Sequence, residues 1–189
     1  MKKKSVIRDW VESIIVAFIL AMIIRTFVVQ AFKIPTGSMR PTLLEGDLIL
    51  VNKFIYGAKV PFMNMTLPAI QKPQRGDVVV FIYPENPKKD FIKRLVATET
   101  ETVEIKNTAI YINDKLLSDP LFNQRYYYNR GPFAQEGKKI IVPKDSCFVL
   151  GDNSASSQDS RYWGFVPRKN IIGKATLIYW PLNRIRIIK

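Results

Sequence analysis

The sequence predicts a mainly β protein, in which an N-terminal transmembrane helix precedes an antiparallel β domain with a small inserted β lobe. Two observations support this prediction. The 189-residue chain opens with one long apolar run, and after Ile34 it changes to short runs rich in valine, isoleucine and aromatic residues, separated by turn residues. With 47% apolar residues, a chain of this length can also bury one sizeable core.

The opening apolar run predicts a membrane anchor helix over residues 10–32. Only the residues between Glu12 and Arg25 form a stretch free of charge, which is short for a span of about 20 apolar residues. The longer run nevertheless covers a bilayer if Glu12 and Arg25 reach toward opposite interfaces. The basic tail 1–9 then predicts a cytoplasmic N-terminus, with residues 33–189 outside the cytoplasm.

Two other interpretations of this run stay open. A positive start, a short apolar centre and small residues near 29–31 also fit a cleaved secretory signal. A helix buried in a soluble core is the second possibility. Because Asp9 and Glu12 fit poorly in the basic leader of a signal, a retained anchor is the preferred interpretation.

Several segments after the anchor are typical of β-strands, because they are rich in β-branched and aromatic residues and are bounded by turn residues such as Gly-Asp pairs. They are 46–56, 76–84, 91–98, 101–114, 138–143, 147–152 and 171–182. The segment 101–114 contains the turn and return strand of a hairpin. The polar, poorly patterned segment 118–139 predicts a long loop or small lobe, which places the inserted lobe at about 101–142.

Charge and the rarity of some residue types limit the available chemistry. A net charge of +13, from 29 basic and 16 acidic residues, favours contact with anionic lipid or nucleic acid, although solubility alone also explains it. The sequence lacks the aromatic and basic interleaving of a nucleic-acid platform, so no nucleic acid is expected as a partner. One cysteine, Cys147, excludes an intrachain disulfide, and the lack of histidine argues against zinc and excludes Ser-His and Cys-His pairs.

Ser38 is the candidate nucleophile. It lies in KIPTGSMRPTL, among small and turn-forming residues, where Gly37 allows a sharp backbone turn. Without histidine it needs another base, and Lys93 is a candidate because apolar residues surround it in FIKRLVAT. If Lys93 is buried, its pKa falls and its neutral amine can act as a general base. A lysine at a sheet edge is the ordinary alternative, and this pattern alone does not establish the pair.

Six blocks of the sequence, in order from about residue 25 to the C-terminus, resemble bacterial type I signal peptidase. They are IPTGSMRPTL, GDLILVNKFIYG, RGDVVVF, FIKRLVA, VLGDNSASSQDSRYWGFVP and WPLNRIR. The resemblance implies a membrane-anchored serine endopeptidase with an all-β catalytic domain that holds a Ser–Lys dyad. Such an enzyme removes N-terminal signal peptides from exported preproteins.

By position, the resemblance implies a role for each site residue. Ser38 matches the nucleophile and Lys93 matches the general base. The Thr36 hydroxyl and the Ser38 amide would form the oxyanion hole, where loss of one donor typically slows a reaction about 100- to 1,000-fold. Ser157 matches the serine that orients the lysine amine, and Met39 helps to line the site.

The resemblance also implies scaffold and membrane-contact residues. The scaffold charges are Arg94, Asp152, Asp159 and Arg161. We expect Arg94 to pair with Asp152, although ordinary ion pairs and turn chemistry explain these charges equally well. The candidates to enter the outer leaflet of the membrane, with core packing as their alternative role, are Phe62, Met63, Met65 and Trp180.

The substrate of such an enzyme is a secretory preprotein, cut after a small-x-small site at the bacterial cytoplasmic membrane. Shallow apolar pockets would exclude larger side chains by overpacking. A strand edge near Ser38 could hold the extended preprotein by main-chain hydrogen bonds. The lipid bilayer is the other expected partner, and we infer no obligate protein partner and no metal, nucleotide or organic cofactor.

The sequence departs from the family in two places. ATETE at 97–101 replaces the usual Gly-x-Pro-Gly-Asp turn after the lysine, and SAS follows GDN where the family often has an Arg and an Asp or Asn. An inactive homologue that binds signal peptides, a self-cleaving repressor-type peptidase and a basic membrane-tethered binding module are the alternatives. The N-terminal anchor and the absence of a DNA-binding domain count against the repressor type.

Overall fold

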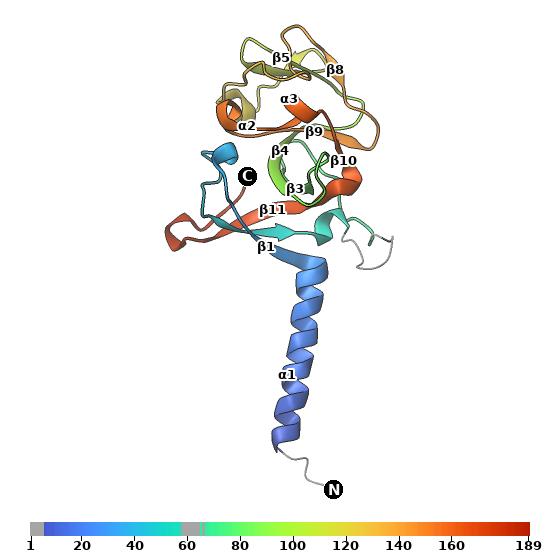
Figure 1. Ribbon diagram of the computed structural model, residues 1–189, viewed down its shortest axis with the longest axis vertical. Helices are drawn as coiled ribbons and strands as arrows, with labels where there is room; N and C mark the ends of the chain where they lie inside the picture. The colour runs from blue at the N-terminus through green and yellow to red at the C-terminus, as the bar shows by residue number, and fades with distance from the viewer. Residues whose placement is uncertain (1–5, 58–64, 66) are drawn as a thin grey trace.

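The predicted fold class is confirmed by the computed structural model, which describes residues 6–57, 65 and 67–189. One long helix projects from a body of antiparallel β-strands, and a smaller lobe lies at the end of the body away from the helix (Figure 1). The predictions made for Phe62 and Met63 lie outside the described residues.

The N-terminal helix α1 (Val6–Ile23) continues through a π-helical turn, η1 (Ile24–Val28). Side chains are exposed on every face of α1. The stretch Ile7–Val28 has 22 residues and is long and apolar enough to cross a membrane by length and composition. An α-helix of this length would measure about 33 Å, close to the thickness of the hydrocarbon core of a bilayer.

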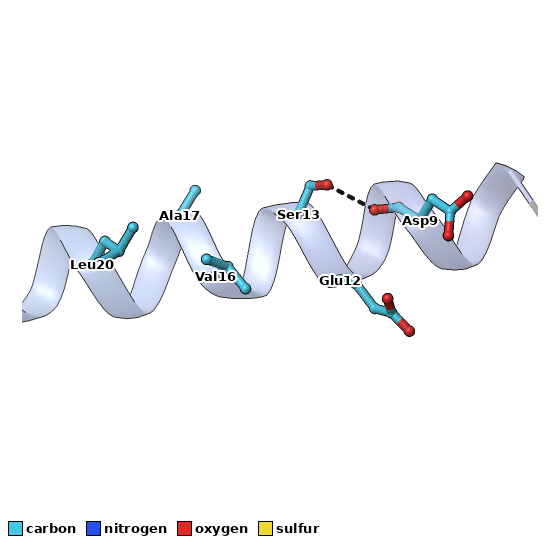
Figure 2. Close-up of a pocket in the computed structure, with 6 residues that line it drawn as sticks. All are labelled: Asp9, Glu12, Ser13, Val16, Ala17 and Leu20. Carbon is cyan, nitrogen blue, oxygen red and sulfur yellow. Dashed lines mark hydrogen bonds between the residues drawn. The ribbon is translucent and has the colours of Figure 1, made fainter.

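The polar side chains of α1 lie toward its N-terminal end, and they pair within the helix. Ser13 Oγ donates a hydrogen bond to the Asp9 carbonyl oxygen at 2.8 Å (Figure 2). Arg8 Nε donates to Glu12 Oε1 at 2.9 Å, an i,i+4 ion pair. The following turns drawn in Figure 2 carry apolar side chains. The polar groups of α1 therefore lie near one end of the apolar stretch.

The helix ends earlier than the sequence predicts, because strand β1 (Val29–Lys33) replaces the last turn of the expected helix over 10–32. β1 pairs antiparallel with β2 (Leu48–Asn52), so that Val29 lies opposite Asn52 and Lys33 opposite Leu48. β-Branched valine has a lower helix propensity, and the partner strand satisfies the backbone groups of this segment. That partner is distant in sequence, so no local pattern reveals it.

The main sheet is antiparallel, with the order β1-β2-β11-β3-β4-β9-β10 and with β12 paired to β11. Its remaining strands are β3 (Val78–Ile82), β4 (Asp90–Ala97), β9 (Ser146–Leu150), β10 (Val166–Pro167), β11 (Ile171–Trp180) and β12 (Arg186–Ile187). This order places β4, which contains Lys93, between β3 and β9. Buried apolar side chains of β2, β3 and β11 pack with Met39 and Leu43, so the turn after β1 is fixed against the core of the sheet.

The inserted lobe is a second sheet with the order β7-β6-β5-β8. Its strands are β5 (Thr102–Lys106), β6 (Ala109–Ile112), β7 (Lys115–Leu116) and β8 (Ile140–Ile141). Short helices α2 (Pro120–Asn123) and α3 (Ser160–Trp163) accompany the sheets. The core of the lobe includes Val96 of β4 and Phe148 of β9, so the lobe packs directly on the strand pair that contains Lys93.

Short 3-10 turns complete the described structure. They are η2 (Gly37–Met39), η3 (Phe54–Tyr56), η4 (Ser154–Ser156), η5 (Arg168–Asn170) and η6 (Leu182–Arg184). Two of them, η2 and η4, lie side by side and frame the candidate site.

Candidate active site

Ser38 lies on the turn η2, just beyond the end of β1, and is 8% exposed. The preceding residue, Thr36, is extended, with φ −138° and ψ 156°. Two hydrogen bonds from Asn153 hold the turn in place. The Asn153 backbone N–H donates to the Ser38 carbonyl at 3.0 Å, and its Nδ2 donates to the Gly37 carbonyl at 3.1 Å. The position of Ser38 is therefore fixed by the loop that follows β9.

Lys93 lies on β4, opposite Val79 of β3, and is 4% exposed. Its Nζ lies 2.8 Å from Ser38 Oγ and 2.9 Å from the Ile92 carbonyl oxygen. The Phe91 ring centroid is 5.5 Å from the same nitrogen. Burial lowers the pKa of Lys93 from its ordinary value of 10.5 to about 8, against the opposite influence of Asp159 and Asp152.

This arrangement can transfer a proton between a serine hydroxyl and an amine. A neutral amine has a lone pair that can accept the hydroxyl proton, and the 2.8 Å separation is within the range for a hydrogen bond. Among residues 6–57, 65 and 67–189, no three Cys, Asp or Glu side chains gather as metal ligands would. The chemistry that the Ser38 and Lys93 side chains offer is nucleophilic and acid–base.

Arg94, the next residue along β4, forms the expected ion pair with Asp152. Arg94 Nε and Nη2 donate to the two carboxylate oxygens at 2.8 and 2.7 Å, and both side chains are only 1% exposed. Arg94 Nη1 donates to the Gly76 carbonyl at 2.7 Å. Thr42 Oγ1 and Arg125 also hydrogen-bond to Asp152. The pair joins β4 to the loop after β9, whose Asn153 hydrogen-bonds to the turn that contains Ser38.

Asp159 and Arg161, two of the expected scaffold charges, form a fully buried ion pair that the sequence did not predict. The Asp159 side chain accepts a hydrogen bond from the backbone N–H of Gly151 at 3.0 Å, and Arg161 Nη2 donates to the carbonyl oxygens of Ser154 and Ser157 at 2.8 and 3.2 Å. These bonds close the loop between β9 and α3. The two buried ion pairs thus both support the loop that follows β9.

Ser157 is near the pair, but it does not make the contact that the resemblance implies. Its hydroxyl donates to the Gln158 carbonyl oxygen at 3.4 Å, whereas the Lys93 amine contacts Ser38 and Ile92. A Cβ atom at Gly151 would lie 2.2 Å from Ser157 Oγ and 2.5 Å from the Ser38 carbonyl oxygen. Only a glycine leaves room for this packing.

The atypical segment after Lys93 forms a turn without glycine or proline. Glu101 Oε2 accepts hydrogen bonds from the Thr98 backbone N–H at 2.7 Å and from Thr98 Oγ1 at 3.1 Å. Thr100 adopts a φ of 69°, a left-handed conformation that a residue other than glycine rarely takes. The Glu101 carboxylate therefore stabilises a bend that the family usually builds from glycine and proline.

The other predicted residues are placed as follows. Thr36, two residues before Ser38, is exposed. Met39, the residue after Ser38, is fully buried. Met65 and Trp180 are each 50% exposed, so neither is part of the core. The structure does not place these two side chains against the Ser–Lys pair.

The sequence analysis assigned no role to Asn153, Thr42 or Arg125, which support the site. Asn153 is the last residue of the GDN block. That block could have indicated its role, because a motif close to an active site commonly hydrogen-bonds to the backbone of the site. Arg125 lies in the poorly patterned part of the lobe and Thr42 lies in a turn. Their contacts with Asp152 join segments that are distant in sequence, and we find no local signal for them.

Comparisons with known proteins agree with this geometry. The family model described as "Signal peptidase, peptidase S26" matches residues 7–180. Signal peptidase I of Pseudomonas aeruginosa is 33% identical over 96% of this chain and 76% of its own length. Signal peptidase I of Aquifex aeolicus is 33% identical over 92% of this chain and 84% of its own, and that of Leptolyngbya laminosa is 36% identical over 97% and 85%. The chain therefore belongs to the signal peptidase family, peptidase S26, and is a serine peptidase that removes signal peptides.

Proposed function

We propose that Ser38 is the nucleophile and Lys93 the general base of this signal peptidase. The observation that supports the proposal most strongly is the 2.8 Å separation of Lys93 Nζ and Ser38 Oγ, with both residues buried. Since burial lowers the pKa of Lys93 to about 8, a useful fraction of the amine is neutral near physiological pH.

In the proposed mechanism, the Lys93 amine takes the Ser38 proton while Oγ attacks the carbonyl carbon of the scissile bond. The Ser38 N–H and the Thr36 hydroxyl donate to the developing oxyanion. The protonated Lys93 then gives its proton to the leaving amine, and an acyl-enzyme remains. Lys93 finally deprotonates a water molecule, which attacks the ester and releases the signal peptide from Ser38.

The proposed substrate is an extended preprotein segment with small residues at the first and third positions before the cut. β9 pairs with β4 only from Arg94 onward, so the backbone before Lys93 extends beyond this neighbour. An extended peptide can pair with such an edge. Ile34 and Met39 are buried in the core on either side of Ser38 in the sequence, and we propose that the space beside Ser38 admits only small side chains.

We further propose that α1 is a single membrane anchor in the bacterial cytoplasmic membrane. Its apolar side chains are exposed all round, which is unfavourable in water and favourable in lipid. Arg8 and the lysines of the N-terminal tail favour a cytoplasmic N-terminus and an external β domain. The exposed Met65 and Trp180 are candidates to contact the outer leaflet.

The test is cleavage of a preprotein with an Ala-x-Ala site by the full chain in detergent. We expect the wild type to cut after the second alanine, and Ser38→Ala and Lys93→Ala to be inactive. Lys115→Ala, which removes an exposed lysine of the lobe, is the matched control and should cut at the wild-type rate. Cleavage that survives in Lys93→Ala would reject the proposed base.

The orientation has a separate test in spheroplasts. The native Cys147 is 1% exposed, so a Lys115→Cys variant would carry one accessible thiol. A membrane-impermeant maleimide should label that variant from outside. Labelling only after lysis would show that the β domain faces the cytoplasm and would contradict the proposed topology.

A further inference from the structure

A charged cleft of about 390 Å³ lies next to the turn that holds Ser38. Its walls include Arg40, Arg125, Tyr126, Tyr128 and Asn153, and they also include the carboxylate of Asp152. Asn153 is the residue that donates to the Ser38 and Gly37 carbonyl oxygens, and Arg40 follows Ser38 by two positions. The cleft is therefore adjacent to the proposed nucleophile, and the proposed mechanism assigns no role to the arginines of the cleft.

Arg125 has a nitrogen without a partner in this cleft. Its Nη2 donates to Thr42 Oγ1 at 3.2 Å and to Asp152 Oδ2 at 3.3 Å, but its Nη1 is buried and lacks a hydrogen-bond partner among the described residues. Asp152 is already engaged by the two-point pair with Arg94. The Asp152 carboxylate thus faces two guanidinium groups, and Arg94 also donates to the main-chain oxygen of Lys189 at 3.0 Å.

Two further arginines add positive charge at the rim. Arg130 Nη1 donates to the carbonyl oxygen of Ala155, a residue of the cleft wall, and its guanidinium lies 5.3 Å from the Tyr128 ring centroid. Neither contact neutralises its charge. Arg40 pairs with Glu45 at 2.7 Å, but both side chains are well exposed, so this pair is weak and can exchange for another carboxylate.

The position of the cleft relative to the substrate follows from the free strand edge. In the proposed mode, the signal peptide pairs with the edge of β4 before Lys93, upstream of the cut. The chain beyond the cut must leave Ser38 on another side, and the segment from Arg40 together with the loop at Asn153 is open to it. An extended chain advances about 3.3 to 3.6 Å per residue, so the second to fourth residues after the cut can reach the cleft.

We propose that this cleft binds an acidic side chain at the second to fourth position of the mature protein. Guanidinium groups bind carboxylates through paired, charge-assisted hydrogen bonds, and the exposed guanidinium groups of Arg40 and Arg130 supply the donors at the rim. The exposed rings of Tyr126 and Tyr128 offer flat surfaces for the neighbouring peptide. This inference rests on the proposed function, and it names the class of preprotein that the enzyme prefers.

The test compares peptide substrates that share one Ala-x-Ala site and differ in a single residue after the cut. With the full chain in zwitterionic detergent, we expect glutamate at the second, third or fourth position to raise kcat/KM about five-fold over glutamine, mainly through KM. Glutamate at matched positions before the Ala-x-Ala site should give no gain. The preference should shrink in about 0.5 M salt, because salt screens exposed charges.

Variants identify the residues responsible. Arg40→Glu combined with Arg130→Glu should reverse the preference, so that a lysine peptide becomes better than a glutamate peptide. Arg125→Gln should abolish the preference, and because Arg125 also supports Asp152, the exposed double variant keeps the test valid if Arg125→Gln folds poorly. Lys115→Glu with Lys139→Glu changes the net charge equally at exposed sites of the lobe, and it should keep the wild-type preference.

The outcomes separate this inference from the proposed function. Equal cleavage of glutamate and glutamine peptides by the wild type would overturn the inference alone. A preference that persists in the arginine variants, or that disappears equally in the lobe control, would also overturn it. If the wild type cuts no peptide at all, the proposed function fails, and this inference fails with it.

Discussion

The two faces of β4 provide two neighbouring cations with different hydrogen-bond partners. Lys93 and Arg94 are adjacent, so their side chains point to opposite faces of the sheet, and both are almost completely buried. Lys93 contacts a serine hydroxyl and a backbone carbonyl. Arg94 contacts both oxygens of the Asp152 carboxylate. Burial lowers the pKa of Lys93 to about 8, so this side chain can supply a neutral amine, whereas Arg94 cannot.

Burial penalises the charged form of either side chain, but only lysine can respond by losing a proton. Arginine does not deprotonate in proteins, so Arg94 is stable in the interior only with a buried carboxylate. Among the described residues, no carboxylate forms an ion pair with Lys93, and burial lowers its pKa to about 8 despite the fields of Asp159 and Asp152. The same strand thus provides a structural cation on one face and a candidate base on the other.

The largest effect on activity is expected when Lys93 is replaced. Lys93→Arg keeps a cation at the site but removes the capacity to deprotonate, and we expect kcat/KM to fall at least about 100- to 10,000-fold. Lys93→Met, which has a similar length, should lose as much activity. The measurement is single-turnover cleavage of an Ala-x-Ala preprotein. Substantial activity in Lys93→Arg would show that a neutral amine is not required.

Removing Arg94, the cation on the other face of β4, should lower the stability of the fold. Arg94→Met leaves Asp152 buried without its main partner, and we expect the free energy of unfolding to fall by about 3 to 5 kcal/mol. Urea unfolding of the full chain in mild detergent, followed by tryptophan fluorescence, measures it.

A second variant checks the cause of that loss. Arg94→Met with Asp152→Leu removes both charges of the pair and should recover part of the stability, although Arg125 then loses its own contact with Asp152. If the single and double variants are equally unstable, the buried charge is not the reason for the loss.

Lys93→Met should be more stable than the wild type at neutral pH. The native pKa of Lys93, about 8, is lower than the ordinary value of 10.5. Well below pH 8 the amine is protonated in both states, so the native state bears the full penalty of a buried charge, about 3 kcal/mol. Between about pH 8 and 10.5 the native amine is neutral while the unfolded one still binds a proton, so the penalty fades as pH rises.

The stability gain of Lys93→Met should therefore be largest at neutral pH and close to zero above about pH 10.5. Unfolding curves of both proteins at several pH values provide the measurement. A gain that is independent of pH would mean that packing, rather than the charge of Lys93, causes it.

Local signals in the sequence were sufficient for the fold class, and the resemblance was sufficient to single out Ser38 and Lys93, whose catalytic roles stay a prediction. Turn residues and β-branched runs mark the strands, and the blocks around Ser38 and Lys93 resemble one family closely. Contacts between distant segments were not predictable in the same way. The pairing of Val29 with Asn52 ends the helix early, and the approach of Arg125 to Asp152 builds a cleft from a segment without pattern.

Ser157 illustrates a third limit. The resemblance places this residue near the lysine, and the packing against Gly151 agrees, but the direction of its hydroxyl depends on local bonds that a sequence does not encode. The turn at 98–101 is similar, because a carboxylate replaces the expected glycines and proline. In both cases the motif predicts where the segment lies, but it does not predict which hydrogen bonds its side chains form.

The most direct test is a titration of the Lys93 amine itself. In the full chain, with carbon-13-labelled lysine side chains and zwitterionic micelles, NMR can follow each amine with pH, and the signal missing from Lys93→Met identifies residue 93. We expect that signal to titrate with a pKa of about 8, well separated from those of exposed lysines. A midpoint near the ordinary 10.5 would mean that the amine stays charged at neutral pH, and Lys93 could not then be the base.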